Sequence, residues 1–238
     1  MTDGNWAASL YQVSTWILPL LVAIPFHEAA HGFAAHRLGD DTAWNLGRVT
    51  FNPLKHVDLF GTVILPLVLF LSGSGFLFGY AKPVPVNFRA LREPRFGSVL
   101  VAAAGPGINI VLAFASAFLV YVALLLPQGA AFWLVQNLVH SIFINVMLAA
   151  FNMLPLPPLD GGRVAVGLLP RALALPLARL EPLGIPLLLL LLIVLPAVGA
   201  RLNVDLNIVA WVLGWPVDFM VNLIASVAGL PAQYFALD

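Results

Sequence analysis

The chain alternates long apolar stretches with short connections that are rich in charge, proline and glycine. A run of about 20 predominantly apolar residues can cross a lipid bilayer as a helix. Candidate runs are residues 11–37, 57–78, 97–126, 131–154, 184–200 and 207–230. The pattern predicts an all-α polytopic membrane protein with about five to six transmembrane or re-entrant segments.

The connections between these runs carry different local signals. Residues 38–56 contain "NLGRVTFN", whose alternation and β-branched residues predict a short β element after the first helix. Residues 79–95 hold prolines spaced for extended chain. Residues 155–182 open with "PLPPLDGGR", a rigid turn, and we expect a short interfacial helix after it.

Composition supports the membrane assignment and excludes several other classes. The 238 residues are 61% hydrophobic and 9% charged, whereas a soluble domain carries about 25% charge. The net charge is zero and cysteine is absent, so neither nucleic-acid binding nor thiolate chemistry is indicated. "MTDGNWAAS" lacks a positive n-region, so we expect no cleaved signal peptide. With no long polar stretch, residues 1–238 are expected to form a single integral-membrane domain.

The first run contains an unusual polar cluster, because "HEAAH" places His27, Glu28 and His31 in an apolar helix. Residues four apart share a helix face about 6 Å apart along the axis, so both imidazoles can bind one metal ion. Glu28 is placed to accept a proton from a metal-bound water. Zinc suits two neutral imidazoles and a carboxylate. Chance is the alternative, but a charge within a span costs about 2.5–3.5 kcal/mol on insertion scales.

A catalytic zinc site needs a third protein ligand. His36 lies about 140° round the helix from His31 and misses its face, so we expect an interfacial histidine there. His56 lies in a polar connection, where a solvated position is expected. The best carboxylate is Asp160 in "NMLPLPPLDGGR", where Gly161 and Gly162 permit a tight turn. Spacing alone leaves both readings open, a metal ligand or an ordinary Asp-Gly turn.

Together these motifs resemble the site-2 protease family of intramembrane zinc metalloproteases, peptidase family M50. The resemblance rests on "HEAAHG", "AAAGPGIN" (residues 102–109) and "NMLPLPPLDGGR", with "GRVTFNPLKHVDLFGT" and "GYAKPVPVN" similar to segments of small bacterial members. It covers residues 20–165, in the expected order, with additional membrane helices over 184–230. No stretch resembles the PDZ or CBS modules of larger relatives, so we expect the small form.

The resemblance implies a set of roles. His27, His31 and Asp160 would bind one Zn²⁺ per chain, and Glu28 would be the general base. Asn152 matches the family's asparagine, and its amide could donate to the scissile carbonyl or its oxyanion.

Further polar residues in the predicted helices favour contacts between helices. Residues 131–154 carry a stripe on one face, for which we expect helix–helix hydrogen bonds at Asn137 and Ser141; its members are Asn137, Ser141, Asn145 and Asn152. His140 is expected to be packed and hydrogen-bonded. Asn109 either acts as Asn152 does or ties helices together. Gly105 and Gly107 are expected to allow close helix approach.

The resulting hypothesis is hydrolysis of a peptide bond in or near a transmembrane segment of a membrane-protein substrate. The expected location is the bacterial cell membrane, with the lipid bilayer as surroundings and no nucleic-acid partner. A helical substrate must unwind first, and the predicted strand at 46–51 could pair with it. The alternatives are a metal-ion transporter and a catalytically inactive relative that binds membrane partners. Against the first, acidic and histidine residues do not recur along several spans.

The metal site constrains topology. If residues 57–78 cross the membrane once, Asp160 ends on the opposite face from the histidines. If they dip in and return, both meet on one face, and all lysines and arginines except Arg201 share that side. The positive-inside rule favours this arrangement with that side cytoplasmic. We therefore expect residues 38–56, residues 79–95 and the C-terminus to face the cytoplasm.

Overall fold

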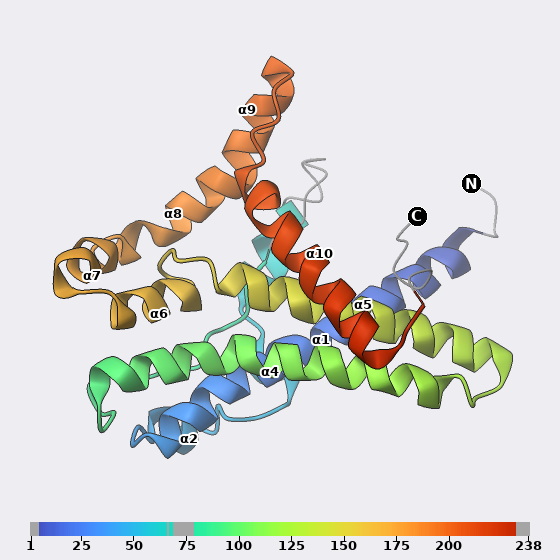
Figure 1. Cartoon of the computed structure of the whole chain (residues 1–238), viewed down its shortest axis with the longest axis horizontal. Helices are drawn as coiled ribbons and strands as arrows, with labels where there is room; N and C mark the ends of the chain where they lie inside the picture. The colour runs from blue at the N-terminus through green and yellow to red at the C-terminus, as the bar shows by residue number, and fades with distance from the viewer. Residues whose placement is uncertain (1–4, 66, 69–78, 232–238) are drawn as a thin grey trace.

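A computed structural model describes residues 5–65, 67–68 and 79–231, and these contain helices but no strand. Five helices in this part of the chain are long and apolar enough to cross a membrane. Three of them pack against one another as a bundle: α1 (Asn5–Arg37), α4 (Pro94–Ala123) and α5 (Gln128–Asn152). Figure 1 shows α4 and α5 side by side, with α1 crossing behind them.

Local sequence signals explain where the bundle helices begin and turn. Pro94 stands in the first turn of α4 and Pro127 precedes α5, positions where the missing N–H of proline is harmless. The short turn at 124–127 makes α4 and α5 an antiparallel pair. Small buried residues such as Ala113 and Ala117 let the helices approach closely.

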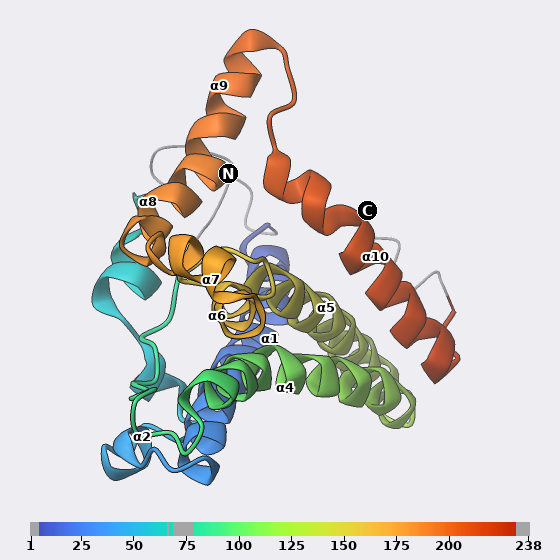
Figure 2. The same ribbon diagram turned by 60° about the vertical axis from the view of Figure 1, so that its left-hand side comes forward.

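The C-terminal part leaves this bundle and returns to it. Short helices follow one another along it: α6 (Asp160–Leu168), α7 (Arg171–Ala178), η3 (Glu181–Leu183), α8 (Gly184–Leu189), η4 (Leu190–Val194) and α9 (Leu195–Leu202). The chain reverses at Asn203, which has a left-handed backbone with φ of 54°. Helix α10 (Ile208–Ala228) then packs against α5 and α4. Figure 2 shows α8 and α9 projecting from the bundle before α10 returns.

The outer surface of the helices is apolar, as a membrane protein requires. Large hydrophobic side chains are exposed on several helices, among them Leu21, Val111, Phe118 and Trp215. Such a surface is unfavourable in water but matches the hydrocarbon of a bilayer. The predicted multi-pass membrane architecture is therefore supported.

The predicted β element after the first helix is wrong. Helix α2 (Thr42–Asn45) is followed by Gly47, whose φ of 60° turns the chain. The β-branched Val49 packs onto α1, where a Cβ on Gly32 would lie 2.7 Å from its Cγ2. The alternating residues thus cover a helix instead of pairing with a strand. Residues 46–51 therefore form no strand edge with which an extended substrate could pair.

The two connections flanking the run at 57–78 meet each other. After η1 (Pro53–His56), helix η2 (Leu59–Ile64) begins the run. The Tyr80 N–H donates to the Gly61 carbonyl at 3.0 Å, and the Thr62 hydroxyl donates to the Tyr80 carbonyl at 2.9 Å. Both connections therefore lie at one end of the bundle, as the re-entrant arrangement requires. The predicted re-entrant course itself includes residues 66 and 69–78, outside the described residues, and the cytoplasmic side stays a prediction.

A buried carboxylate joins the same two connections. Asp40 is 1% exposed and accepts hydrogen bonds from the N–H groups of Thr42, at 3.0 Å, and Asn87, at 2.6 Å. Burial opposes its charge, but these hydrogen bonds outweigh burial and lower the pKa of Asp40. Residues 79–87 form neither helix nor strand between these contacts, in keeping with their prolines.

Candidate metal centre

Helix α1 presents His27 and His31 on one face, as their spacing predicts, and α4 packs directly on them. Gly105 of α4 makes this approach possible, because a Cβ there would lie 2.7 Å from Cε1 of His27. The expectation of close packing is therefore confirmed for Gly105. It is wrong for Gly107, where an added Cβ would meet nothing within 4 Å.

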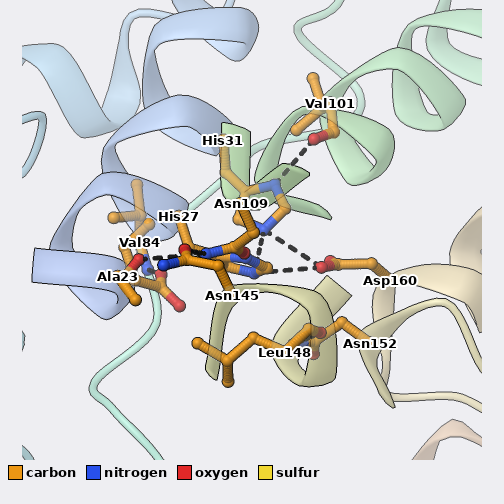
Figure 3. Close-up of polar contacts among 11 residues, drawn as sticks. Ala23, His27, His31, Val84, Val101, Asn109, Asn145, Leu148, Asn152 and Asp160 are labelled. Carbon is orange, nitrogen blue, oxygen red and sulfur yellow. Dashed lines mark hydrogen bonds and ion pairs between the residues drawn. The ribbon is translucent and has the colours of Figure 1, made fainter. Parts of the chain in front are cut away.

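Hydrogen bonds fix how the two imidazole rings are turned (Figure 3). The His31 Nδ1–H donates to the main-chain carbonyl of Val101 at 2.7 Å, and His27 Nδ1 lies 2.6 Å from Oδ1 of Asn109. The Nε2 atoms therefore point toward a common position, 3.0 Å from each other. A carbonyl can only accept, so His31 Nδ1 carries the proton and Nε2 offers a lone pair.

Asp160, the first residue of α6, supplies a third atom at this position. Its Oδ2 lies 3.2 Å from His27 Nε2 and 3.3 Å from His31 Nε2. Gly161 and Gly162 lie in the first turn of α6, and neither has positive φ. A Cβ on Gly162 would instead lie 2.5 Å from the Leu156 carbonyl carbon, so the glycines seat α6 on the preceding chain.

The three atoms fit a metal ion. Zinc bonds of about 2.0–2.1 Å at tetrahedral angles separate neighbouring ligand atoms by about 3.3–3.4 Å, close to the observed spacing. Asp160 Oδ2 is buried yet has no hydrogen-bond partner among the described residues. A proton shared by the two nitrogens would leave this oxygen unsatisfied, whereas a metal ion would satisfy all three atoms.

The charge of Asp160 suits the same role. A carboxylate oxygen supplies negative charge, and together with two imidazole nitrogens it makes the mixed nitrogen and oxygen donor set that suits Zn²⁺.

Glu28, the expected base, flanks this cluster and is not part of it. Its Oε2 accepts a hydrogen bond from the Val84 N–H at 2.7 Å. Val84 therefore lies against α1 beside the cluster. Sequence analysis missed Val84, and no side-chain signal could have revealed it because a main-chain group makes the contact.

The polar stripe on α5, which includes Asn152, makes two kinds of hydrogen bond, within α5 and to α4. The side chains of Asn137 and Asn152 donate to their own helix, at the carbonyls of Trp133 and Leu148, both four residues earlier. The expected helix–helix hydrogen bond is therefore wrong for Asn137. It is confirmed for Ser141, whose hydroxyl bonds to Ser116 of α4 at 2.8 Å. Figure 3 places Asn152 at the end of α5 nearest Asp160, but its predicted oxyanion role stays a prediction.

The remaining histidines lie outside the cluster. His36 pairs with Asp41 on the surface, so it misses the metal face as predicted. His140 bonds to the Thr15 carbonyl and stacks on Trp16, which confirms a packed histidine. The expectation for His56 was wrong. It is 2% exposed and donates to the Thr50 carbonyl, because the connection folds over it.

The known proteins that this chain is similar to share the same description in their names. The chain is 40% identical to "Putative zinc metalloprotease YwhC" of Bacillus subtilis over 181 residues, which are 74% of this chain and 79% of YwhC. It is 33% identical to "Putative zinc metalloprotease Rip2" of Mycolicibacterium smegmatis, over 63% of this chain and 53% of Rip2. "Putative zinc metalloprotease MJ0611" of Methanocaldococcus jannaschii is 32% identical over 58% of this chain and 62% of MJ0611. No family model matches the chain, and no solved structure gives a significant match.

Proposed function

Because the chain belongs to the family of proteins named as putative zinc metalloproteases that includes YwhC, we propose that it is an intramembrane protease of the site-2 type. The observation that carries the proposal is the convergence of His27, His31 and Asp160, whose ligand atoms lie within 4.8 Å of one another beside Glu28. A bacterial cell membrane is the proposed location, with a transmembrane protein as substrate.

The chain's own residues would divide the chemistry between them. Two imidazoles and a carboxylate are the ligand set that zinc takes in catalytic sites, with a further position left open. Zinc supplies Lewis-acid chemistry there when bound, polarising a carbonyl and acidifying water. Glu28 takes a proton from the attacking water and delivers it to the leaving amine. The Val84 N–H keeps the Glu28 carboxylate turned to one side, which limits the orientations that this base can adopt.

The position of the centre along α1 supports a substrate within the membrane. His27 lies ten residues before the last residue of the helix, Arg37, which is about 15 Å along the axis. A peptide bond cleaved at that depth belongs to a membrane-embedded segment. Such a segment hides its peptide groups in helical hydrogen bonds, so it unwinds before hydrolysis.

The test uses the purified full-length protein with a panel of single-span membrane substrates, with and without a zinc chelator. Cleavage that the chelator abolishes and added zinc restores supports the proposal. Metal-dependent flux in sealed vesicles without any cleavage would favour the transporter. Substrate capture without cleavage or flux would favour the inactive relative.

A further inference from the structure

We propose that Asn109 and Asn145 are positioning residues that lock His27 in the tautomer needed to bind metal. The inference rests on the proposed function, because it concerns a ligand of the same zinc site. Asn109 of α4 is fully buried and Asn145 of α5 is 1% exposed. Figure 3 shows both amides between the helices, in line with His27 and on the side away from Asp160.

The chain of hydrogen bonds is anchored at a main-chain group. The Asn145 Nδ2 donates to the Ser141 carbonyl at 2.8 Å. A carbonyl oxygen can only accept, so this contact forces the amide nitrogen of Asn145 toward Ser141. Its oxygen Oδ1 must then face Asn109.

The orientation passes from one amide to the next. Asn109 Nδ2 lies 2.7 Å from Asn145 Oδ1, and this oxygen can only accept. Asn109 must therefore turn its own Oδ1 toward His27, where it lies 2.6 Å from Nδ1. Since Oδ1 is also only an acceptor, Nδ1 of His27 carries the proton. Nε2 then offers its lone pair to the metal position.

His31 reaches the same state by a shorter route. Its Nδ1 proton goes directly to the Val101 carbonyl at 2.7 Å. His27 has a side chain as its acceptor instead, and a free amide could turn by 180° and offer a donor. Asn145 opposes that reversal together with the Ala23 carbonyl, which accepts a longer hydrogen bond from Asn109 Nδ2 at 3.5 Å. Residues that hold a ligating histidine in this way typically contribute 10–100-fold to metal affinity.

A purely structural role for these amides predicts a different outcome. Helix–helix hydrogen bonds stabilise the packing of a membrane protein, without regard to the tautomer of a neighbouring ring. Asn137 is the matched comparison, because it is a buried amide on α5 whose hydrogen bond, among the described residues, stays within that helix. The zinc affinity of Asn137→Ala is therefore expected to equal that of the wild type.

The experiment measures zinc dissociation constants of the purified full-length protein by competition with a chromophoric chelator. Asn109→Ala should weaken zinc binding about 10–100-fold, and Asn145→Ala should weaken it by a smaller factor. Asn109→Asp alone should also weaken binding, because its second carboxylate oxygen would face Oδ1 of Asn145, which can only accept. In the Asn145→Ala background this repulsion is gone, so Asn109→Asp should restore binding there, because either carboxylate oxygen accepts the Nδ1 proton. Additive effects in this double-mutant cycle would overturn the proposal.

A second readout follows the tautomer without any metal. Nitrogen-15 NMR of histidine-labelled, zinc-free protein should show Nδ1 protonated for His27 in the wild type. Asn109→Ala should shift the proton toward Nε2, whereas Asn137→Ala should not. Wild-type affinity and tautomer in Asn145→Ala would contradict the inference even if Asn109→Ala fails to fold. A wild type that binds no zinc would instead overturn the proposed function, while the NMR comparison would still decide the tautomer.

Discussion

The helices around the metal centre and the C-terminal helices are buried in different ways. Buried polar side chains occur in all three helices of the bundle, α1, α4 and α5, for example Thr15, Asn109 and Asn145. Among the described residues of α8, η4, α9 and α10, the buried side chains are all apolar, as at Leu192, Val217 and Ile224. Both regions contain helices long and apolar enough to cross a membrane, so helix length and hydropathy alone do not explain the difference.

Apolar packing in a bilayer holds helices together without fixing side-chain direction closely. Hydrogen bonds between buried polar groups are directional, and an unsatisfied group is unfavourable there. The bundle thus carries polar groups where atoms must be oriented, around His27, His31 and Asp160. The C-terminal helices require only that their apolar side chains fit together in shape. Substitutions in the two regions should therefore separate metal binding from stability.

The largest effect is expected when a ligand is removed. His31→Ala or Asp160→Ala should reduce bound zinc from about one per chain to almost none in the presence of a competing chelator, because two ligands remain of three. Elemental analysis of the purified protein measures this. His140→Ala is the control, because His140 is a partly buried histidine of α5 that bonds to the Thr15 carbonyl. The zinc content of this variant should stay at the wild-type level. Equal loss in the control would contradict the assignment of ligands.

The next effect comes from steric displacement of the ligands. Gly105→Ala places a methyl group 2.7 Å from Cε1 of His27, so the rings must move. We expect zinc affinity to fall about 100-fold, in line with the sensitivity of sites to shifts of about 1 Å. Gly107→Ala meets nothing within 4 Å, so it should keep zinc and gain up to about 1 kcal/mol of helix stability. Unchanged zinc affinity in Gly105→Ala would refute the packing described here.

A third substitution separates turnover from metal binding within the bundle. Asn152→Ala should leave zinc in place and slow cleavage by up to about 100-fold if the amide donates to the oxyanion. Among the described residues its side chain bonds within its own helix, to the Leu148 carbonyl, so the fold should survive. Steady-state rates and zinc content of the same preparation measure both. Zinc loss equal to that of Asp160→Ala would make it a structural part of the metal site.

The smallest effect on the metal is expected in the C-terminal helices. Ile224 of α10 is fully buried in the apolar core, and Ile224→Ala should lower the free energy of unfolding by about 2–5 kcal/mol. The zinc dissociation constant of the folded protein should nevertheless equal that of the wild type. Thermal unfolding measures the change in stability, and chelator competition measures the zinc dissociation constant. A large drop in zinc affinity would show that the two regions are coupled.

The sequence predicted the long apolar helices and the shared face of His27 and His31 because both depend on local periodicity. A spacing of four residues places His27 and His31 on one face in any helix. Asp160 needed the family resemblance, because the path from α5 back to α1 depends on tertiary packing. The roles of Glu28 and Asn152 stay predictions.

The errors arose where non-local packing decides local structure. The alternating pattern around Val49 indicated a strand, but those residues cover α1 at Gly32. His56 looked solvated by its polar neighbours, yet the returning chain buries it. The contacts of Val84 and Val101 are made by main-chain atoms, which every residue carries. No residue type at these positions could have signalled them.

The most direct test of the account compares the wild type with Glu28→Gln for zinc content and peptide cleavage in the same preparations. The glutamine keeps the size of the side chain and can still accept the Val84 N–H, but it cannot take a proton. We expect about one zinc per chain in both proteins and cleavage in the wild type alone. Cleavage by folded Glu28→Gln, or absence of zinc from the wild type, would contradict it.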